Sequence, residues 1–146
     1  MFNGGVALEF TAPVDPERLE RAWRAVVDDS DALRTVFTEQ DGRVQQRIRE
    51  PFPVSLPVHD FCDENRPDDA ASRWIDERVS QPLELAIGVF DSALLKLTGE
   101  RWIWYLNVHH LVFDAWSIGV ICQQASRWYG SMVTGERPEP LPQYSD

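Results

Sequence analysis

Two adjacent histidines and a nearby aspartate are the residues of this chain best suited to chemistry. His109, His110 and Asp114 stand in the segment His-His-Leu-Val-Phe-Asp. An imidazole titrates near neutral pH, so it can accept a proton from an amine and return it to a leaving group. Adjacent side chains of a regular strand point to opposite faces, so the two histidines cannot both address one metal ion from such a strand. The pattern favours one histidine facing the core and one facing a cavity or solvent, and a purely structural role stays open.

The elements around the histidines must position them. A strand is predicted from Trp102 to Val108, paired antiparallel with Ser92 to Leu97 across Thr98-Gly99-Glu100. A helix should follow, with Ser117 as its N-cap and its end near Thr134-Gly135. Its buried positions are predicted at helical spacing: Ile118, Ile121, Ala125, Trp128 and Tyr129. Asp114 then lies in the loop before this helix, where it could brace a histidine or pair with an arginine elsewhere.

The rest of the chain predicts further strands and two more helices. These are a strand from Val6 to Thr11, a helix opening at Asp15-Pro16-Glu17, two strands between Leu33 and Ile48 with a hairpin turn at Asp41-Gly42, and a helix from Asp68 to Ser80. The prolines between residues 51 and 57 predict an edge strand or an extended loop. The tail with Pro138, Pro140 and Pro142 should be extended. Together these patterns predict one mixed α/β lobe whose strands pair mostly antiparallel.

Composition narrows the function classes. The chain has 146 residues, of which 43% are hydrophobic, and this is enough for one domain with a core. Its net charge of −10 is unfavourable for binding nucleic acid or an anionic membrane. No basic cluster, transmembrane stretch or signal peptide is visible in the sequence, so a cytoplasmic protein is expected. Cys62 and Cys122 lack a ligand spacing and are predicted to be buried free thiols, so no metal site is expected.

The histidine segment and its continuation Ala115-Trp116-Ser117 resemble the HHxxxDG-W-S motif of condensation domains in nonribosomal peptide synthetases. The segment from Asp31 to Phe37 resembles the Leu-Arg-Thr-x-Phe stretch of the same family and precedes an Asp-Gly hairpin. The last residues, Leu141 to Asp146, resemble the start of its next conserved stretch. The resemblance covers the chain from Phe2 to Asp146.

This resemblance implies one lobe of a chloramphenicol-acetyltransferase-like fold, an α/β (α+β sandwich) with a mostly antiparallel mixed sheet and packed helices. It implies an N-terminal lobe, residues 1–146, without the family's first motif and without the C-terminal lobe. The implied reaction is amide formation between an acyl or peptidyl thioester and an aminoacyl acceptor, both on the phosphopantetheine arms of carrier proteins. The resemblance also implies that no cofactor is bound directly and that the partners are carrier proteins, the second lobe and neighbouring synthetase domains.

Site residues are carried over from the motif. His110 is expected beside the reacting amine, as general base or as a positioning and charge-stabilising group. His109 and Asp114 are expected to be structural, with Asp114 buried and paired with Arg34. Trp116 is expected in the core at the helix entry.

Departures from the family pattern are also informative. Ala115 stands where the family has glycine; it keeps a backbone N–H that could donate to an oxyanion but loses access to positive φ. Asp29 and Ser30 stand where the family usually has Arg-His. As an isolated lobe the chain is expected to be inactive. Two alternatives remain: a noncatalytic condensation-like module that recruits a carrier protein or tailoring enzyme, and an ester-forming acyltransferase with an alcohol acceptor.

Overall fold

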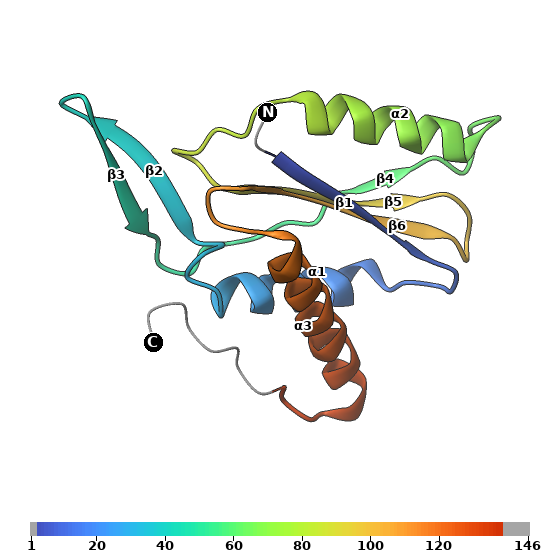
Figure 1. Ribbon diagram of the computed structural model, residues 1–146. Coiled ribbons are helices and arrows are strands. Elements are labelled where there is room, and N and C mark those ends of the chain that lie inside the picture. Colours follow the sequence, from blue (N-terminus) through green and yellow to red (C-terminus); the bar gives the residue numbers. More distant parts are fainter. Residues whose placement is uncertain (1–2, 139–146) are drawn as a thin grey trace.

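The computed structural model describes residues 3–138, which form a three-layer α/β arrangement (Figure 1). The predictions for Pro140, Pro142 and the segment from Leu141 to Asp146 lie outside the described residues. The strands are β1 (Asn3–Phe10), β2 (Thr35–Gln40), β3 (Arg43–Ile48), β4 (Val58–Asp60), β5 (Phe90–Lys96) and β6 (Trp102–His109). The helices are α1 (Pro16–Asp28), α2 (Pro67–Ser80) and α3 (Ala115–Thr134).

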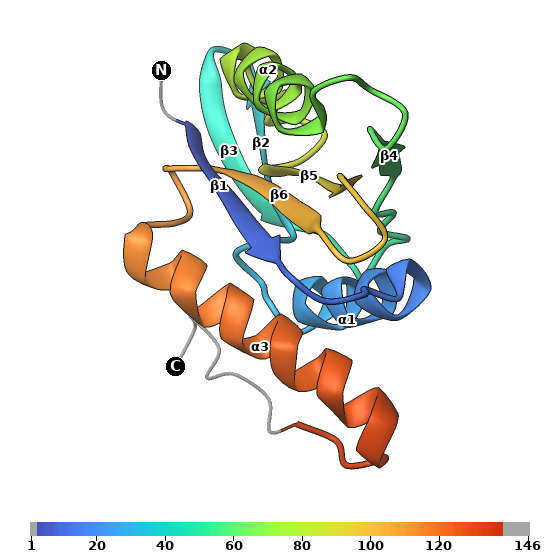
Figure 2. The same ribbon diagram turned by 90° about the vertical axis from the view of Figure 1, so that its right-hand side faces the viewer.

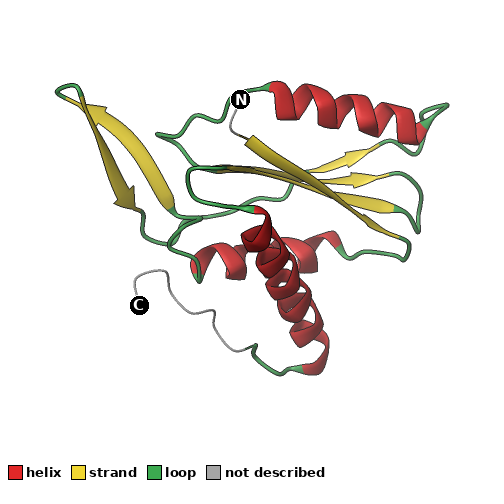
Figure 3. Cartoon of the chain, viewed as in Figure 1, coloured by secondary structure: helices red, strands yellow, loops and turns green. Residues whose placement is uncertain are grey.

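The main sheet has the strand order β1-β6-β5-β4. β1 and β5 both pair antiparallel with β6, whereas β4 pairs parallel with β5 over only three residues. β2 and β3 form a separate hairpin, which extends away from the main sheet (Figure 3). The predicted mixed, mostly antiparallel sheet is therefore confirmed.

Helices cover both faces of the main sheet. α1 and α3 lie against one face and α2 against the other (Figure 2). Side chains of β6 alternate between the two layers: Trp104, Leu106 and Val108 pack toward α1 and α3, whereas Tyr105 packs toward α2. At the centre of the larger core, the fully buried Trp23 of α1 meets Trp104 edge-on, with ring centroids 5.5 Å apart.

The start of α1, the hairpin turn and the end of α3 lie where the sequence predicted them. Asp15 caps α1 by accepting a hydrogen bond from the Arg18 N–H at 3.1 Å, and Pro16 occupies the first helical turn. Asp41 and Gly42 take the positive φ values that a tight hairpin requires. Gly135 closes α3 in the left-handed conformation, with φ 78°.

The two cysteines are free, as predicted, but only one has a partly buried side chain. Cys122 is half-buried on α3. Cys62 is exposed in the turn after β4, where its backbone N–H donates to Asp60 at 2.8 Å. The expectation of a buried Cys62 was wrong, because the polar turn that follows the short β4 lies outside both cores.

Candidate active site

The histidines lie where β6 ends and the chain turns toward α3. His109 is the last residue of β6, and its backbone N–H donates to the Val89 carbonyl at 2.8 Å. The His109 carbonyl accepts from the Val112 N–H at 3.1 Å, which begins the turn. His110 therefore lies just after the regular strand. Its side chain does not have to point to the face opposite that of His109, as it would within the strand.

His109 is held as part of the framework. Its ring is half-buried, and burial, together with the neighbouring His110, lowers the pKa of His109 below its usual range. The Leu111 N–H donates to His109 Nδ1 at 3.2 Å, so the neutral ring carries its proton on Nε2. The His109 ring thus supports the turn that carries its neighbour.

His110 is exposed and has the opposite proton arrangement. Its Nδ1 lies 3.3 Å from the Phe113 carbonyl oxygen. A carbonyl can only accept a hydrogen bond, so this contact requires a proton on Nδ1. In the neutral ring Nε2 is then left as a proton acceptor, which is the form that a general base needs.

Asp114 forms the N-cap of α3, and within residues 3–138 its carboxylate pairs with no arginine. One of its carboxylate oxygens accepts from the Ser117 N–H at 2.9 Å and from the Ser117 hydroxyl at 2.7 Å. These hydrogen bonds hold the pKa of Asp114 below its usual range. Ser117 was predicted to be the N-cap, but the helix begins earlier because the extended backbone of Asp114 and its carboxylate already satisfy the first turn.

Arg34 pairs within its own segment. Its guanidinium donates to Asp31 at 2.5 Å and to the Arg49 carbonyl at 2.6 Å. The predicted pairing of Arg34 with a buried Asp114 was wrong in both parts, because Asp114 is exposed and its carboxylate accepts from Ser117. At the position of a departure from the family pattern, Ser30 accepts from the Leu33 N–H and shapes the turn that carries Arg34.

The start of α3 presents apolar side chains to solvent. Trp116 is 82% exposed and Leu111 is 61% exposed, so the expectation that Trp116 belongs to the core was wrong. Ala115 occupies the first position of α3, where backbone N–H groups lack an acceptor within the helix. Its φ is not positive, because Asp41 is the one non-glycine residue with positive φ in residues 3–138. Alanine therefore brings no backbone strain in place of the family's glycine.

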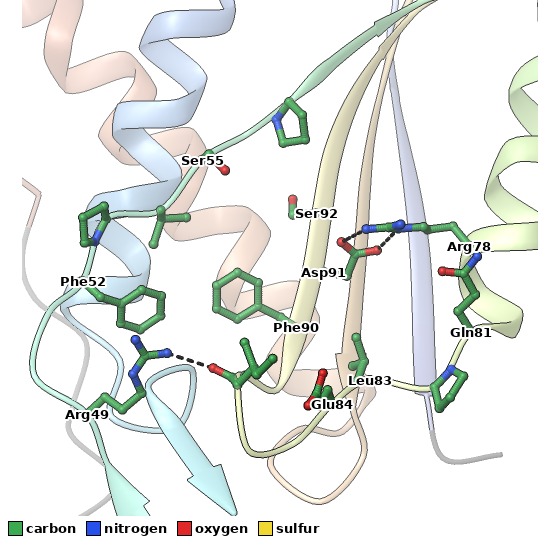
Figure 4. Close-up of a pocket in the computed structure, with 16 residues that line it drawn as sticks. Arg49, Phe52, Ser55, Arg78, Gln81, Leu83, Glu84, Phe90, Asp91 and Ser92 are labelled. Atoms are coloured by element: carbon green, nitrogen blue, oxygen red, sulfur yellow. Dashed lines mark hydrogen bonds and ion pairs between the residues drawn. The ribbon is translucent and has the colours of Figure 1, made fainter.

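A hollow of about 540 Å³ lies elsewhere, between β5 and the segments 49–57 and 81–88 (Figure 4). Both of its arginines are engaged with other residues of its lining. Arg78 binds both carboxylate oxygens of Asp91, and Arg49 donates to the Ile87 carbonyl at 2.8 Å. None of the histidine-segment residues lines this hollow, so it carries no part of the predicted chemistry.

Two kinds of feature are absent from the described part of the chain. Within residues 3–138 no cluster of three or more His, Cys, Asp or Glu side chains could hold a metal ion. Over the same residues, no helix combines the length and apolar character needed to cross a membrane.

The family model for the condensation domain matches residues 1–146. The chain belongs to the condensation-domain family. Among curated proteins it is 32% identical to a probable non-canonical nonribosomal peptide synthetase, CymA, of Salinispora arenicola, covering 99% of this chain and 2% of that protein. It is 34% identical to the chondramide synthase cmdD of Chondromyces crocatus, covering 91% of this chain and 4% of that protein.

Solved condensation domains share the fold of this one. The starter condensation domain of rhizomide synthetase RzmA matches with a TM-score of 0.89 at 30% identity, over 97% of this chain and 36% of that chain. The first condensation domain of the CDA synthetase matches with a TM-score of 0.87 at 28% identity, over 96% and 37% of the two chains. This condensation-domain chain thus has the chloramphenicol-acetyltransferase-like fold and spans about a third of the solved domains that it matches.

Two groups that touch His110 were not predicted from the sequence: the Phe113 carbonyl and Gly4 of β1. A Cβ atom built on Gly4 would lie 3.2 Å from His110 Cε1. The consecutive glycines Gly4 and Gly5 lie just before the predicted strand from Val6 to Thr11, and β1 includes them because it begins at Asn3. They were the available signal, since glycine in a strand often marks a close approach of the backbone. The backbone acceptor has no sequence signal, because every residue carries a carbonyl.

Proposed function

We propose that this chain is the histidine-bearing N-terminal lobe of a condensation domain that forms amide bonds in nonribosomal peptide synthesis. In this proposal a second, C-terminal lobe completes the domain, and the N-terminal lobe is inactive alone. The single observation that carries the proposal is the arrangement of His110, exposed at the strand-to-helix turn with Nδ1 engaged by a carbonyl and Nε2 left to accept a proton.

The proposed reaction joins two substrates on carrier proteins. The amine of an aminoacyl group attacks the thioester carbon of an acyl or peptidyl group, and His110 Nε2 takes the proton that the amine loses. The tetrahedral intermediate then collapses, the C–S bond breaks, and the same proton passes to the thiolate of the phosphopantetheine arm. The products are one amide and one free thiol, so atoms and charge balance without an oxidant or a further reactant.

The residues around His110 have supporting roles in this proposal. The Ala115 N–H, at the open first turn of α3, donates to the oxyanion of the intermediate. His109 supports the turn through Leu111, and Asp114 fixes the start of α3 through Ser117. Arg34 ties the turn before β2 to the residue that follows β3 through Asp31 and the Arg49 carbonyl, and it has no direct role at the reacting atoms.

The exposed apolar residues at the turn support a covering partner. Leu111 follows the proposed base directly and Trp116 lies in the first turn of α3, and both side chains are exposed. Contact with the second lobe would bury them and close the reaction away from water. The chain spans 36% and 37% of two solved condensation domains, which supports a second lobe larger than this one.

The test is a single-turnover condensation followed by intact-protein mass spectrometry. An acyl-loaded donor and an aminoacyl-loaded acceptor carrier protein are mixed with this chain, with and without a separately expressed second lobe. We expect product only when the second lobe is present, and His110→Ala should lower the rate by about 10²–10⁴-fold. His59→Ala is the matched control. The His59 ring packs against Trp74 on the α2 side of the sheet, with ring centroids 4.8 Å apart, so this change should leave the rate unchanged.

Other results would change the proposal in defined ways. Carrier binding without product under either condition would support a noncatalytic recruiting module. Product with a hydroxyl acceptor but not with an amine would support an ester-forming enzyme. Unchanged turnover in His110→Ala would remove His110 from the chemistry.

A further inference from the structure

β1 begins beside the turn that carries His110. It is an edge strand that pairs antiparallel with β6, so Gly4 lies opposite Val108, two residues before His110 in the chain. Opposed residues of an antiparallel pair direct their side chains to the same face, and Val108 packs into the core formed with α1 and α3. A side chain at position 4 would therefore point to that face, at the edge where the His110 ring lies.

The ring of His110 occupies the space that a side chain at position 4 would need. A Cβ built on Gly4 would lie 3.2 Å from His110 Cε1 and 3.3 Å from Nε2. Carbon atoms in comfortable contact are about 3.5–4.0 Å apart, so an added methyl group would crowd the ring. The backbone of Gly4 does not have the positive φ that favours glycine, because Gly42 and Gly135 are the glycines with positive φ in the described residues. What glycine supplies here is room for the ring.

One side of the ring is engaged and the other side fills the space beside Gly4. The Phe113 carbonyl lies 3.3 Å from Nδ1, and Cε1 and Nε2 occupy the place that a Cβ on Gly4 would crowd. His110 as a whole is exposed, so the ring has room to move if the space beside Gly4 is filled. Crowding at Gly4 would turn the ring away from the strand and lengthen the contact with Phe113.

We propose that Gly4 is a positioning residue for His110: the absence of a side chain lets the imidazole lie against β1 with Nδ1 toward the Phe113 carbonyl. The consequence for catalysis rests on the proposed function of His110, whereas the consequence for the ring does not. The two can therefore be tested separately on the same variants.

The first test measures the tautomer of His110 in this chain by nitrogen-15 NMR in alkaline buffer. The sequence has three histidines, so the ring signals can be assigned by substitution. In the unchanged chain we expect the Nδ1–H tautomer of His110 to predominate. In Gly4→Ala we expect a shift toward the Nε2–H tautomer, because the contact that requires Nδ1–H is lost.

Gly5→Ala is the matched control on the same strand. Its added Cβ would point to the other face and lie 2.7 Å from Val79 Cγ2 of α2. We expect it to lower Tm without changing the His110 tautomer. Unchanged nitrogen-15 shifts of His110 in a folded Gly4→Ala chain would overturn the proposal, and so would an equal shift in Gly5→Ala.

Two further measurements keep the test decisive. If Gly4→Ala folds poorly, the double variant Gly4→Ala/His110→Ala should recover the Tm of His110→Ala alone, since the crowded ring is gone; no recovery would contradict the proposal. In the assembled enzyme, Gly4→Ala should lower kcat roughly 10–100-fold with KM little changed. If His110→Ala keeps full turnover, the proposed function fails while the tautomer result for Gly4 still stands.

Discussion

Arg34 offers a sharp test of the observed ion pairing against the pairing expected from the family motif. The structure gives its guanidinium two acceptors, Asp31 at 2.5 Å and the Arg49 carbonyl at 2.6 Å. The arginine side chain is 12% exposed and that of Asp31 is 25% exposed, so water replaces neither contact easily. The perturbation is Arg34→Met, which keeps most of the aliphatic length and removes both hydrogen bonds.

The size of the effect follows from these two contacts. Hydrogen bonds to a charged group contribute about 1.5–3 kcal/mol each, and the partial exposure of Asp31 places its share at the lower end. We expect Arg34→Met to lower the free energy of unfolding by about 3–4.5 kcal/mol. In a double-mutant cycle with Asp31→Asn, the coupling energy should be about 1–1.5 kcal/mol. Urea unfolding followed by tryptophan fluorescence measures all four corners of the cycle.

Arg66 is the matched control, because it pairs with Asp69 at the same three-residue spacing but with side chains 83% and 60% exposed. Arg66→Met should change the unfolding free energy by less than about 0.5 kcal/mol. Hydrogen exchange at the Ser117 amide is the second readout, since Ser117 is capped by Asp114 and not connected to Arg34. Faster exchange there in folded Arg34→Met would refute this account and support the pairing of Arg34 with Asp114.

Three further predictions concern the core, the buried phenol and the helix cap. Leu94→Ala removes a fully buried side chain and should lower the free energy of unfolding by about 3–5 kcal/mol in urea titrations; a loss under about 1 kcal/mol would show that this core is loosely packed. Burial, with the nearby charge of Asp91, raises the pKa of Tyr105 to about 12, so this residue's contribution to stability is full below pH 10 and falls by about 1–2 kcal/mol as pH rises toward 12. Denaturant titrations across that range should show the loss in the unchanged chain and a smaller one in Tyr105→Phe; equal losses would contradict the assignment. The pKa of Asp114 is lowered in the folded state, so its contribution to stability is present above about pH 4 and is lost as pH falls through the folded-state pKa. A carbon-13 titration of the Asp114 carboxyl should therefore give a midpoint below 3.8. A midpoint at or above 3.8 would argue against the hydrogen bonds from Ser117.

Much of the fold could be predicted because its signals are local. Asp15 before Pro16 starts α1 through a cap that reaches three residues along the chain. Asp41-Gly42 and Gly135 provide backbone conformations that few other residues adopt easily. The histidine motif is equally local, since its residues lie within one short stretch of the chain, and it indicates the family by itself. Such signals act within a few residues, so the order of the amino acids is enough to read them.

The contacts between distant segments and the exposure of each side chain could not be predicted in the same way. Sequence order does not say that Arg34 reaches the Arg49 carbonyl, or that β4 joins β5 in parallel. Trp116 is apolar and stands at a helix entry, yet it faces solvent because neither core of the described chain reaches it. The contact between Gly4 and His110 joins residues more than a hundred positions apart, and it exists because β1 pairs with β6 along its whole length. The free energy of such contacts depends on which surfaces the fold brings together, and one sequence read along its length does not contain that information.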